Sequence, residues 1–573
     1  MAADTHTQTA VTDNSPAKFR SLAADYFEQV YFGFSPTAGT QAGLHQYDAK
    51  LEDYSRAEVD HEIADLNKFA TKFDELSDAG LDEGTRGDLT MVRNNIRGSL
   101  LELQTIRPWE KNPDTYSSGI ANSAFVLMER KFAPADERLR SLIAREKQMP
   151  AAFTAARQNL KNPPRVFTEI ALEQLPDITT FFERDVPAAF ADAKDPAAVA
   201  EFHKTNAAVV ASLREYEQWL KSDLLPRSNG DFRIGADAFS KKLLYDEMVD
   251  TSLDQLLTIA YADLHKNQAE FARVAKEVDR SKTPKDVLAE LASIHPAPDR
   301  LLPTFQNTFD GLIRFIKEKH IITIPSDVQP VLEETPPFMR ATTQASMDSP
   351  GPFEKNSNTA YFNVTLPEND WSAEHIAEHM AAFNAGTIIS TSVHEAYPGH
   401  YVQFLWVNHA DLSQVRKIIT ANTNVEGWAH YCEQMMLDEG YGQPGEGAKD
   451  AREAKLIRLG QLQDALLRDA RFIVGIKMHS GQMTFEQAAD FFVSDGYQSR
   501  SVGLVETKRG TTDPTYLYYT LGKLQIVKLR SDLEKKQGAN FSLQHFHDDF
   551  MRQGGAPIKI VRQALLGDDS PTL

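Results

Sequence analysis

The sequence contains a single cysteine, Cys432, among its 573 residues. One cysteine cannot form an intrachain disulfide, and it cannot supply a zinc site built from several thiolates. The shortage of cysteine does not identify a cell compartment, because many exported bacterial proteins also lack this residue.

Basic residues are also scarce. The chain has 61 Lys and Arg against 81 Asp and Glu, which gives a formal net charge of −20. A protein that binds nucleic acid needs clustered Lys and Arg to neutralise phosphates, so this balance argues against a nucleic-acid partner. It suits an enzyme whose substrates are neutral or cationic.

Long apolar runs are absent as well. No stretch of eighteen apolar residues occurs, so we expect no membrane-spanning helix. The start, "MAADTHTQTAVTDNSPAKF", lacks the basic and apolar regions of a signal peptide, and it predicts a flexible lead-in over residues 1–18. The same start also fits the mature end of an exported protein. We expect a soluble protein, periplasmic or secreted if a signal peptide was removed and cytoplasmic otherwise.

What the chain does contain is helical periodicity. Segments such as "EVDHEIADLNKFATKFDEL" place apolar residues at i, i+3, i+4 and i+7, which predicts a mainly α fold. Helix starts are marked at Thr283, followed by Pro284, and by a capping box from Thr484 to Gln487. The clearest strand is "TAYFNVTL", within residues 349–370.

The chain divides near residues 227–239, where "RSNGDFRIGADAF" interrupts the helical pattern. We expect an N-terminal helical half over residues 19–235 and a C-terminal catalytic half over residues 236–573. The two halves are expected to interlock as one unit.

A stretch in the second half, "STSVHEAYPGHYVQF" (residues 391–405), resembles a zinc-peptidase motif with two extra residues. Residues six apart on an unbroken helix differ by about 240° around the axis, so His394 and His400 could not share a metal there. Pro398 removes a hydrogen bond and Gly399 tolerates an unusual backbone, so we expect the helix to bulge and to bring the two histidines together.

A third ligand should come from another segment, because hydrolytic zinc sites use three protein ligands and one open position. The helix predicted over residues 422–442 carries Glu426, His430 and Glu433 on one face. Glu426 is the best placed ligand. His430 and Glu433 would lie behind the ligands, where Glu433 could orient a ligand histidine. Glu395 would act as general base.

Two other interpretations compete with this one. A His-Glu pair within a helix is common by chance in a chain with 16 histidines. The segment "HIAEH", with His375 and His379, also matches an inverted zinc motif at ideal helical spacing, or it is an ordinary solvated helix face.

"HEAYPGHYVQ" followed by "EGWAHYCEQ" resembles the bacterial domain-of-unknown-function 885 family, whose members look like zinc-dependent peptidases of the Glu-zincin type. The blocks "DFRIGADAFSKKLL", "TAYFNVTL" and "YLYYTLGKLQIVKLR" extend the resemblance from about residue 20 to residue 560. It implies a large helical zincin-like body with a short β element beside the active-site helix, and one zinc ion per chain. By position, His394, His400 and Glu426 would be the ligands and Glu395 the base.

The resemblance implies further site residues. Tyr519, with Tyr518 as an alternative, matches a tyrosine that donates to an oxyanion, and His479 matches a histidine near the substrate. The family tends to have an aspartate shortly before that histidine, where this chain has "VGIKMH". Tyr361 and Asn363, on the predicted strand, are candidates for holding the substrate backbone.

The sequence thus predicts zinc-dependent hydrolysis of short or unfolded peptides. The alternatives are a catalytically silent helical protein that binds a ligand or partner, and a hydrolase of non-peptide amides. A carboxypeptidase would need a basic anchor, for which the candidates are Arg500, Lys508, Arg509 and Lys523. The oligomeric state and the choice between exo- and endopeptidase stay open.

Overall fold

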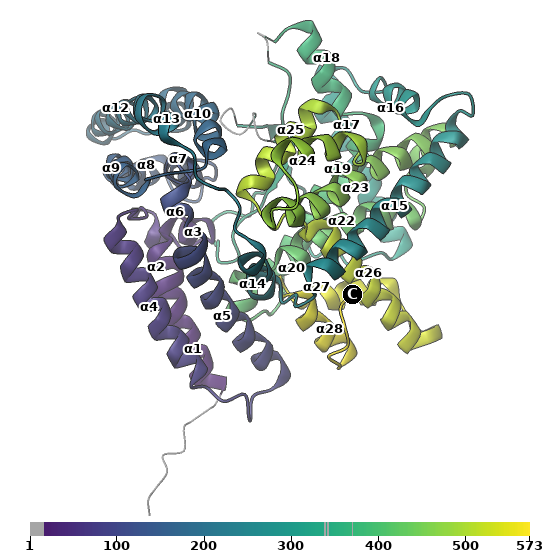
Figure 1. Cartoon of the computed structure of the whole chain (residues 1–573), viewed down its shortest axis with the longest axis horizontal. Coiled ribbons are helices and arrows are strands. Elements are labelled where there is room, and N and C mark those ends of the chain that lie inside the picture. The colour runs from purple at the N-terminus through teal and green to yellow at the C-terminus, as the bar shows by residue number, and fades with distance from the viewer. Residues whose placement is uncertain (1–15, 337–339, 341–342, 369–370) are drawn as a thin grey trace, which may run out of the picture.

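The computed structural model describes residues 16–336, 340, 343–368 and 371–573, and these residues are mostly helical (Figure 1). The predicted mainly α fold is therefore confirmed. Of the predicted lead-in, residues 1–15 lie outside the described part of the chain, whereas residues 16–18 already belong to the first helix.

The N-terminal half forms two groups of helices, drawn in purple and in blue on the left of Figure 1. π-helical turns extend several of these helices: η1 (Phe27–Tyr31), η3 (Glu102–Ile106), η4 (Phe181–Asp185) and η5 (Leu220–Leu224). The first group contains α1 (Pro16–Tyr26), α2 (Phe32–Phe34), α3 (Pro36–Gln41), α4 (Arg56–Asp74), α5 (Glu83–Leu101) and α6 (Pro108–Lys111). The second contains α7 (Asp114–Met128), α8 (Ala135–Glu146), α9 (Met149–Asn159), α10 (Arg165–Thr180), α11 (Val186–Ala189), α12 (Pro196–Trp219) and α13 (Leu225–Arg227).

The C-terminal half is a larger helical body on the right of Figure 1. Its first helices are α14 (Ala236–Glu247), α15 (Leu253–Val278), α16 (Pro284–Ala292), α17 (Leu301–Lys319) and α18 (Ala373–Ala382). Its central helices are α19 (Ala385–Glu395), α20 (His400–His409), α21 (Gln414–Ile418), α22 (Asn422–Asp438) and α23 (Ala451–His479). The last helices are α24 (Phe485–Ser494), α25 (Arg500–Thr512), α26 (Tyr518–Gln537), α27 (Leu543–Met551) and α28 (Ile558–Leu566).

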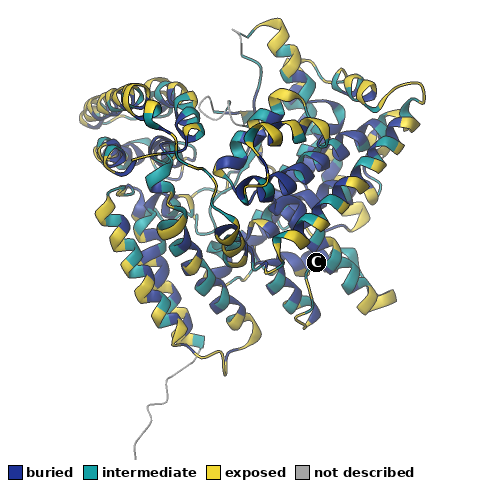
Figure 2. Cartoon of the chain, in the orientation of Figure 1, coloured by how far each residue is buried: buried dark blue, intermediate teal, exposed yellow. Residues whose placement is uncertain are grey.

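One hydrophobic core joins both halves. It runs from Phe19 on α1 to Leu566 on α28 and includes side chains from α4, α5, α17, α19, α20 and α22. The second N-terminal group has a core of its own, built from residues between Leu51 and Leu224. Figure 2 shows buried residues concentrated around the central helices α19, α22 and α23. The helices that carry the motif residues therefore lie in the interior of the molecule.

A small sheet lies beside these helices. Its strands are β1 (Val331–Glu334), β2 (Ala345–Asp348) and β3 (Tyr361–Val364), in the order β1-β3-β2. β3 pairs in parallel with β1 and antiparallel with β2. A second pair, β4 (Gln443–Pro444) and β5 (Gly447–Ala448), follows α22. The predicted strand "TAYFNVTL" is thus the central strand, and β1 and β2 were not predicted.

Within the described part of the chain, every helix is too short or too polar to span a bilayer. This agrees with the expectation drawn from the absence of long apolar runs.

Candidate metal centre

The motif histidines lie on two separate helices. α19 ends at Glu395 and α20 begins at His400, with a short connection that contains a cis Tyr397–Pro398 peptide bond. Backbone hydrogen bonds between residues more than four apart cross this break. The Gly399 N–H, for example, donates to the Val393 carbonyl at 2.9 Å. We expected a bulge inside one helix. The structure instead ends one helix and starts another, because Pro398 cannot continue the α-helical hydrogen bonding.

Two residues fix this connection. A Cβ atom on Gly399 would lie 1.8 Å from the carbonyl oxygen of His394, so only glycine fits there. The indole N–H of Trp428, on α22, donates to the Pro398 carbonyl at 2.9 Å. The "EGWA" segment therefore serves two purposes, because its tryptophan holds the break while its glutamate faces the histidines.

His394, His400 and Glu426 converge on one point. Glu426 Oε2 lies 3.4 Å from His394 Nε2 and 3.5 Å from His400 Nε2. In a tetrahedron with metal–ligand bonds of about 2.1 Å, ligand atoms lie about 3.4 Å apart. Glu426 Oε2 and His400 Nδ1 are buried without a hydrogen-bond partner. The spacing and the orphaned carboxylate oxygen fit a bound zinc ion, and among the described residues no other cluster of three such ligands occurs.

Glu433 lies behind His394. Its Oε1 accepts a hydrogen bond from His394 Nδ1 at 2.7 Å, which leaves Nε2 to face the metal site. Its Oε2 accepts from His430 Nδ1 at 3.2 Å, and Arg468 Nη2 lies 3.1 Å from Oε1. Glu433 thus contacts His394, and His430 contacts Glu433, whereas Arg468 was not predicted.

Burial and neighbouring charges set the protonation states of Glu433, His430 and His394. Burial alone would raise the pKa of Glu433, but Arg468 beside it holds this pKa well below its usual range. Burial lowers the pKa of His430 to about 3, so its ring is neutral. Burial alone would lower the pKa of His394, but the neighbouring carboxylates of Glu426 and Glu433 raise it to about 9. A ligand histidine must lose that proton before it binds a cation.

Glu395, the proposed base, is the last residue of α19 and lies beside strand β2. Its Oε2 accepts a hydrogen bond from the Met347 N–H at 3.1 Å. β2 pairs with β3 on one side only, so this bond comes from its outer edge. The outer edge of β2 therefore lies against the carboxylate of Glu395. Met347 could not be predicted, because β2 has only four residues.

Tyr519, at the start of α26, lies beside the histidines. Its ring is centred 6.3 Å from that of His394, and the guanidinium of Arg509 donates to its hydroxyl at 3.1 Å. Arg468 and Arg471 also lie over the tyrosine ring. Burial raises the pKa of Tyr519, so the hydroxyl keeps its proton and can donate it. The alternative, Tyr518, donates instead to Asp513 at 2.9 Å.

His479 is held by backbone groups. Its Nε2–H donates to the Gly510 carbonyl at 2.7 Å, and its Nδ1 accepts from the Ile234 N–H at 3.3 Å. Both nitrogens are thus occupied away from the metal ligands. Because Gly510 follows Arg509, His479 helps to position α25 and the arginine that meets Tyr519.

Tyr361 and Asn363 lie on the central strand β3, whose backbone is already paired on both sides. Only their side chains are available for a ligand. Asn363 is 2 % exposed, and its Oδ1 is buried without a partner.

The inverted motif lies elsewhere. His375 is exposed and stacks on Trp371, and His379 Nε2 donates to the Thr365 carbonyl at 2.8 Å. In the parts of the chain that are described, no third ligand joins this pair.

Of the four basic residues considered as anchors, Arg509 alone contacts the candidate site. Arg500 pairs with Glu486 and Asp490, Lys508 pairs with Glu173, and the buried Lys523 pairs with Asp263.

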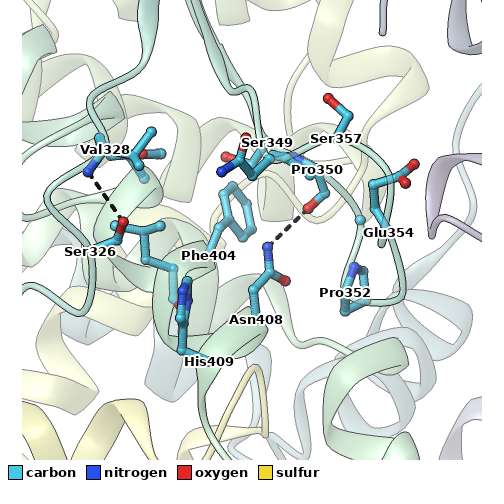
Figure 3. Close-up of a pocket in the computed structure, with 14 residues that line it drawn as sticks. Ser326, Val328, Ser349, Pro350, Pro352, Glu354, Ser357, Phe404, Asn408 and His409 are labelled. Atoms are coloured by element: carbon cyan, nitrogen blue, oxygen red, sulfur yellow. Dashed lines mark hydrogen bonds between the residues drawn. The ribbon is translucent and has the colours of Figure 1, made fainter. Parts of the chain in front are cut away.

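A pocket lies along α20, beside the candidate metal site (Figure 3). Phe404, one helical turn after His400, stacks on the His400 ring with centroids 6.0 Å apart and lines the pocket. Asn408 donates to the Pro350 carbonyl at 3.2 Å, in the loop that follows β2. The pocket is lined mainly by polar side chains and backbone, and it lies between the motif helix and the loop that leaves the sheet.

The chain was compared with known families and structures. A model of the family described as "Bacterial protein of unknown function (DUF885)" matches residues 36–565. A solved structure described as "a putative lipoprotein of unknown function" from Shewanella oneidensis is 26% identical with a TM-score of 0.78, and the match covers 96% of this chain and 100% of that one. A "putative lipoprotein" from Colwellia psychrerythraea is 18% identical with a TM-score of 0.80. That match covers 96% of this chain and 98% of the other, and it shows a likeness of fold alone. No protein with a curated description matches the chain.

Proposed function

We propose that this chain, which belongs to the bacterial DUF885 family, is a zinc-dependent peptidase that acts on short or unfolded peptides. The observation that carries the proposal is the convergence of His394, His400 and Glu426, with an orphaned carboxylate oxygen 3.4 and 3.5 Å from two imidazole nitrogens. A zinc ion in such a site supplies Lewis acidity, which lowers the pKa of water and polarises a carbonyl group.

The protein's own residues would carry the proton transfers. Glu395, aligned by the Met347 N–H, takes a proton from the attacking water and passes it to the leaving amine. The Tyr519 hydroxyl donates to the carbonyl oxygen as negative charge develops there. Arg509, which donates to that hydroxyl, holds it in place. An extended peptide along the outer edge of β2 would bring its carbonyl to Glu395.

The first experiment measures metal content and cleavage together. Purified wild-type protein and Glu395→Gln are dialysed against zinc, assayed for bound metal, and incubated with a defined peptide mixture that is read by mass spectrometry. Both proteins should bind one zinc ion per chain. Glu395→Gln should lose about 10²- to 10⁴-fold in cleavage rate, since the general base is removed.

Glu378→Gln is the matched control, because Glu378 is the exposed glutamate of the "HIAEH" segment. It should cleave like the wild type. Equal cutting by Glu395→Gln and the wild type would contradict the role given to Glu395. A wild-type protein that binds no zinc and cuts no peptide would favour the silent ligand-binding alternative.

An exported location is also part of the proposal. It is supported by the two solved neighbours, which are described as lipoproteins. Fractionation of the native host would test it, with the protein expected in the periplasmic or membrane fraction and retention with cytoplasmic markers as the contrary result.

A further inference from the structure

The small sheet has one apolar face and one polar face. Phe362 and Val364 of β3 are fully buried in the main core. Successive side chains of a strand point to opposite faces, so Tyr361 and Asn363 lie on the other one. The strand registers place three further side chains on that polar face: Glu333 on β1 and Ser346 and Asp348 on β2.

The end of α7 covers this polar face with more charge. Arg130 forms ion pairs with Asp348 and, at 3.1 Å, with Glu129. The side chains of Glu129 and Arg130 are 7% and 8% exposed. Arg130 is thus paired with two carboxyl groups, and a third, that of Glu333, belongs to the same face of the sheet. We call Glu129, Glu333 and Asp348, together with Ser346 and Asn363, the acidic sheet face.

The carboxyl groups of this face disfavour one another's charge. Burial, followed by the hydrogen bond and charge of Asp348, raises the pKa of Glu129 to about 10. Burial and the charge of Asp348 also raise the pKa of Glu333. An incoming cation would relieve this repulsion, because it favours the charged form of each carboxyl group.

Unpartnered acceptors lie on the same face. Asn363 is 2 % exposed, and its Oδ1 has no hydrogen-bond partner. Its neighbours across the sheet are Glu333 and Ser346, and the Ser346 Oγ is likewise buried without a partner. Buried polar atoms in native proteins are normally paired, so these oxygens indicate a ligand that brings N–H or O–H donors.

A metal ion fits these observations poorly. Among the described residues, the one group of three His, Cys, Asp or Glu side chains close enough to hold an ion is His394, His400 and Glu426. The carboxyl groups of the acidic sheet face do not converge in that way. An organic ammonium group can instead span separated acceptors, since it carries three donors.

One end of the acidic sheet face adjoins, along strand β2, the residue that contacts Glu395. Asp348 directly follows Met347, whose N–H donates to Glu395. A residue of extended chain spans about 3.3 Å, so an ammonium group held near Asp348 lies within one or two residues of the bond that Glu395 would act on.

We propose that the acidic sheet face binds the free α-ammonium group of the peptide, which makes this protein an exopeptidase that acts at the amino end. The inference rests on the proposed peptidase function and adds the class of substrate. It gives the side chain of Asn363 a role in substrate binding. Arg509 is then not a substrate anchor, and its role is to hold the Tyr519 hydroxyl.

A binding experiment tests this without requiring catalysis. Zinc-loaded Glu395→Gln protein is titrated by calorimetry with tetra-alanine, with its N-acetyl form and with its C-terminal amide. The free peptide and the amide should bind equally well, and N-acetylation should weaken binding about tenfold or more, because it removes a charge-assisted set of hydrogen bonds.

Two variants test whether the difference in binding between free and acetylated peptide comes from the acidic sheet face. Glu333→Gln in the same background should reduce the difference between free and acetylated peptide. Glu334→Gln, the next residue of β1, should leave it unchanged, because Glu334 pairs with Arg340 away from the polar face. With wild-type protein, cuts should fall within two residues of the amino end.

Several results would overturn the inference. These are equal binding of free and acetylated tetra-alanine, no binding of either, or an equal effect of the two glutamate variants. Binding of acetyl-Ala-Lys-Ala-Ala as tight as that of tetra-alanine would assign the face to a lysine side chain instead. A preference for free peptide without any cleavage by the wild type would remove the proposed function and keep the ammonium site.

Discussion

Glu433 determines which nitrogen of His394 faces the candidate metal site. Its side chain has no exposed surface, and it accepts hydrogen bonds from His394 and His430 while Arg468 balances its charge. A carboxylate can only accept, so His394 must carry its proton on Nδ1 and present a lone pair on Nε2.

Glu433→Gln should therefore weaken zinc binding about 10- to 100-fold, the usual loss when a group behind a metal ligand is changed. An amide can donate to Nδ1 and stabilise the wrong tautomer of His394. Competition with a chromophoric chelator measures the affinity. Asp438→Asn, at the exposed end of the same helix, is the control and should bind zinc normally. Unchanged affinity in Glu433→Gln would contradict the role of Glu433.

Among single residues, the sequence predicted those that share one face of a helix. Glu426, His430 and Glu433 recur at helical spacing, so their common face could be predicted. Arg468 and Met347 could not, because their place beside Glu433 and Glu395 depends on how distant elements pack. His479 was expected near the substrate, yet both of its nitrogens bond to backbone.

At the scale of elements, helix α22 is capped from another part of the chain. Glu247, the last residue of α14, accepts hydrogen bonds from the Asn422 N–H at 3.1 Å and from the Thr423 N–H at 2.8 Å. These N–H groups have no partner within their own helix, so a carboxylate from α14 satisfies them. α22 carries Glu426 and Glu433, so this cap also positions the candidate metal site.

Stability should depend on the charge of Glu247. Burial raises the pKa of Glu247 from 4.5 to about 7. The folded protein then binds more protons than the unfolded chain between these two values, so this residue's contribution to stability is full below pH 4.5 and falls as pH rises to about 7. The shift corresponds to about 3 kcal/mol.

Glu247→Gln should flatten this dependence, because an amide does not titrate. Urea unfolding midpoints at pH 5 and pH 7.5 measure it, and the wild type should lose more stability than the variant over that interval. Parallel pH profiles for the two proteins would contradict the account.

Helix starts could be predicted from the sequence, because the residues that cap a helix are close together in the chain. The N-caps at Thr283 and Thr484 are confirmed, and the latter forms the expected capping box with Gln487. The central strand was predicted, but its partners were not, because strand pairing is a long-range property and each partner has four residues. We expected a bulge after Glu395, whereas the structure has a full break between two helices. A proline shows that the helix is interrupted, but it does not show how many residues the interruption contains.

At the scale of the whole molecule, the two halves of the chain are joined through α5. This helix packs on α14, and Asp88 forms a buried ion pair with Arg416 of α21 at 2.7 Å. The main core also passes from one half to the other. The helices that carry the candidate metal ligands therefore depend on N-terminal helices for part of their burial.

Asp88→Asn should destabilise the protein by about 3–5 kcal/mol, because it leaves the guanidinium of Arg416 buried without its counter-charge. The thermal unfolding midpoint of the zinc-free protein measures this, so that metal binding does not mask the loss. Asp74→Asn, at an exposed ion pair with Arg97, should change stability little. Equal midpoints for both variants would show that α5 does not hold the halves together.

We expect His394, His400 and Glu426 to hold one zinc ion. Anomalous diffraction at the zinc edge, from crystals grown with zinc, would locate the ion. One strong peak per chain should lie about 2.0–2.2 Å from His394 Nε2, His400 Nε2 and a carboxylate oxygen of Glu426. A peak beside His375 and His379, or no peak at the three residues, would contradict it.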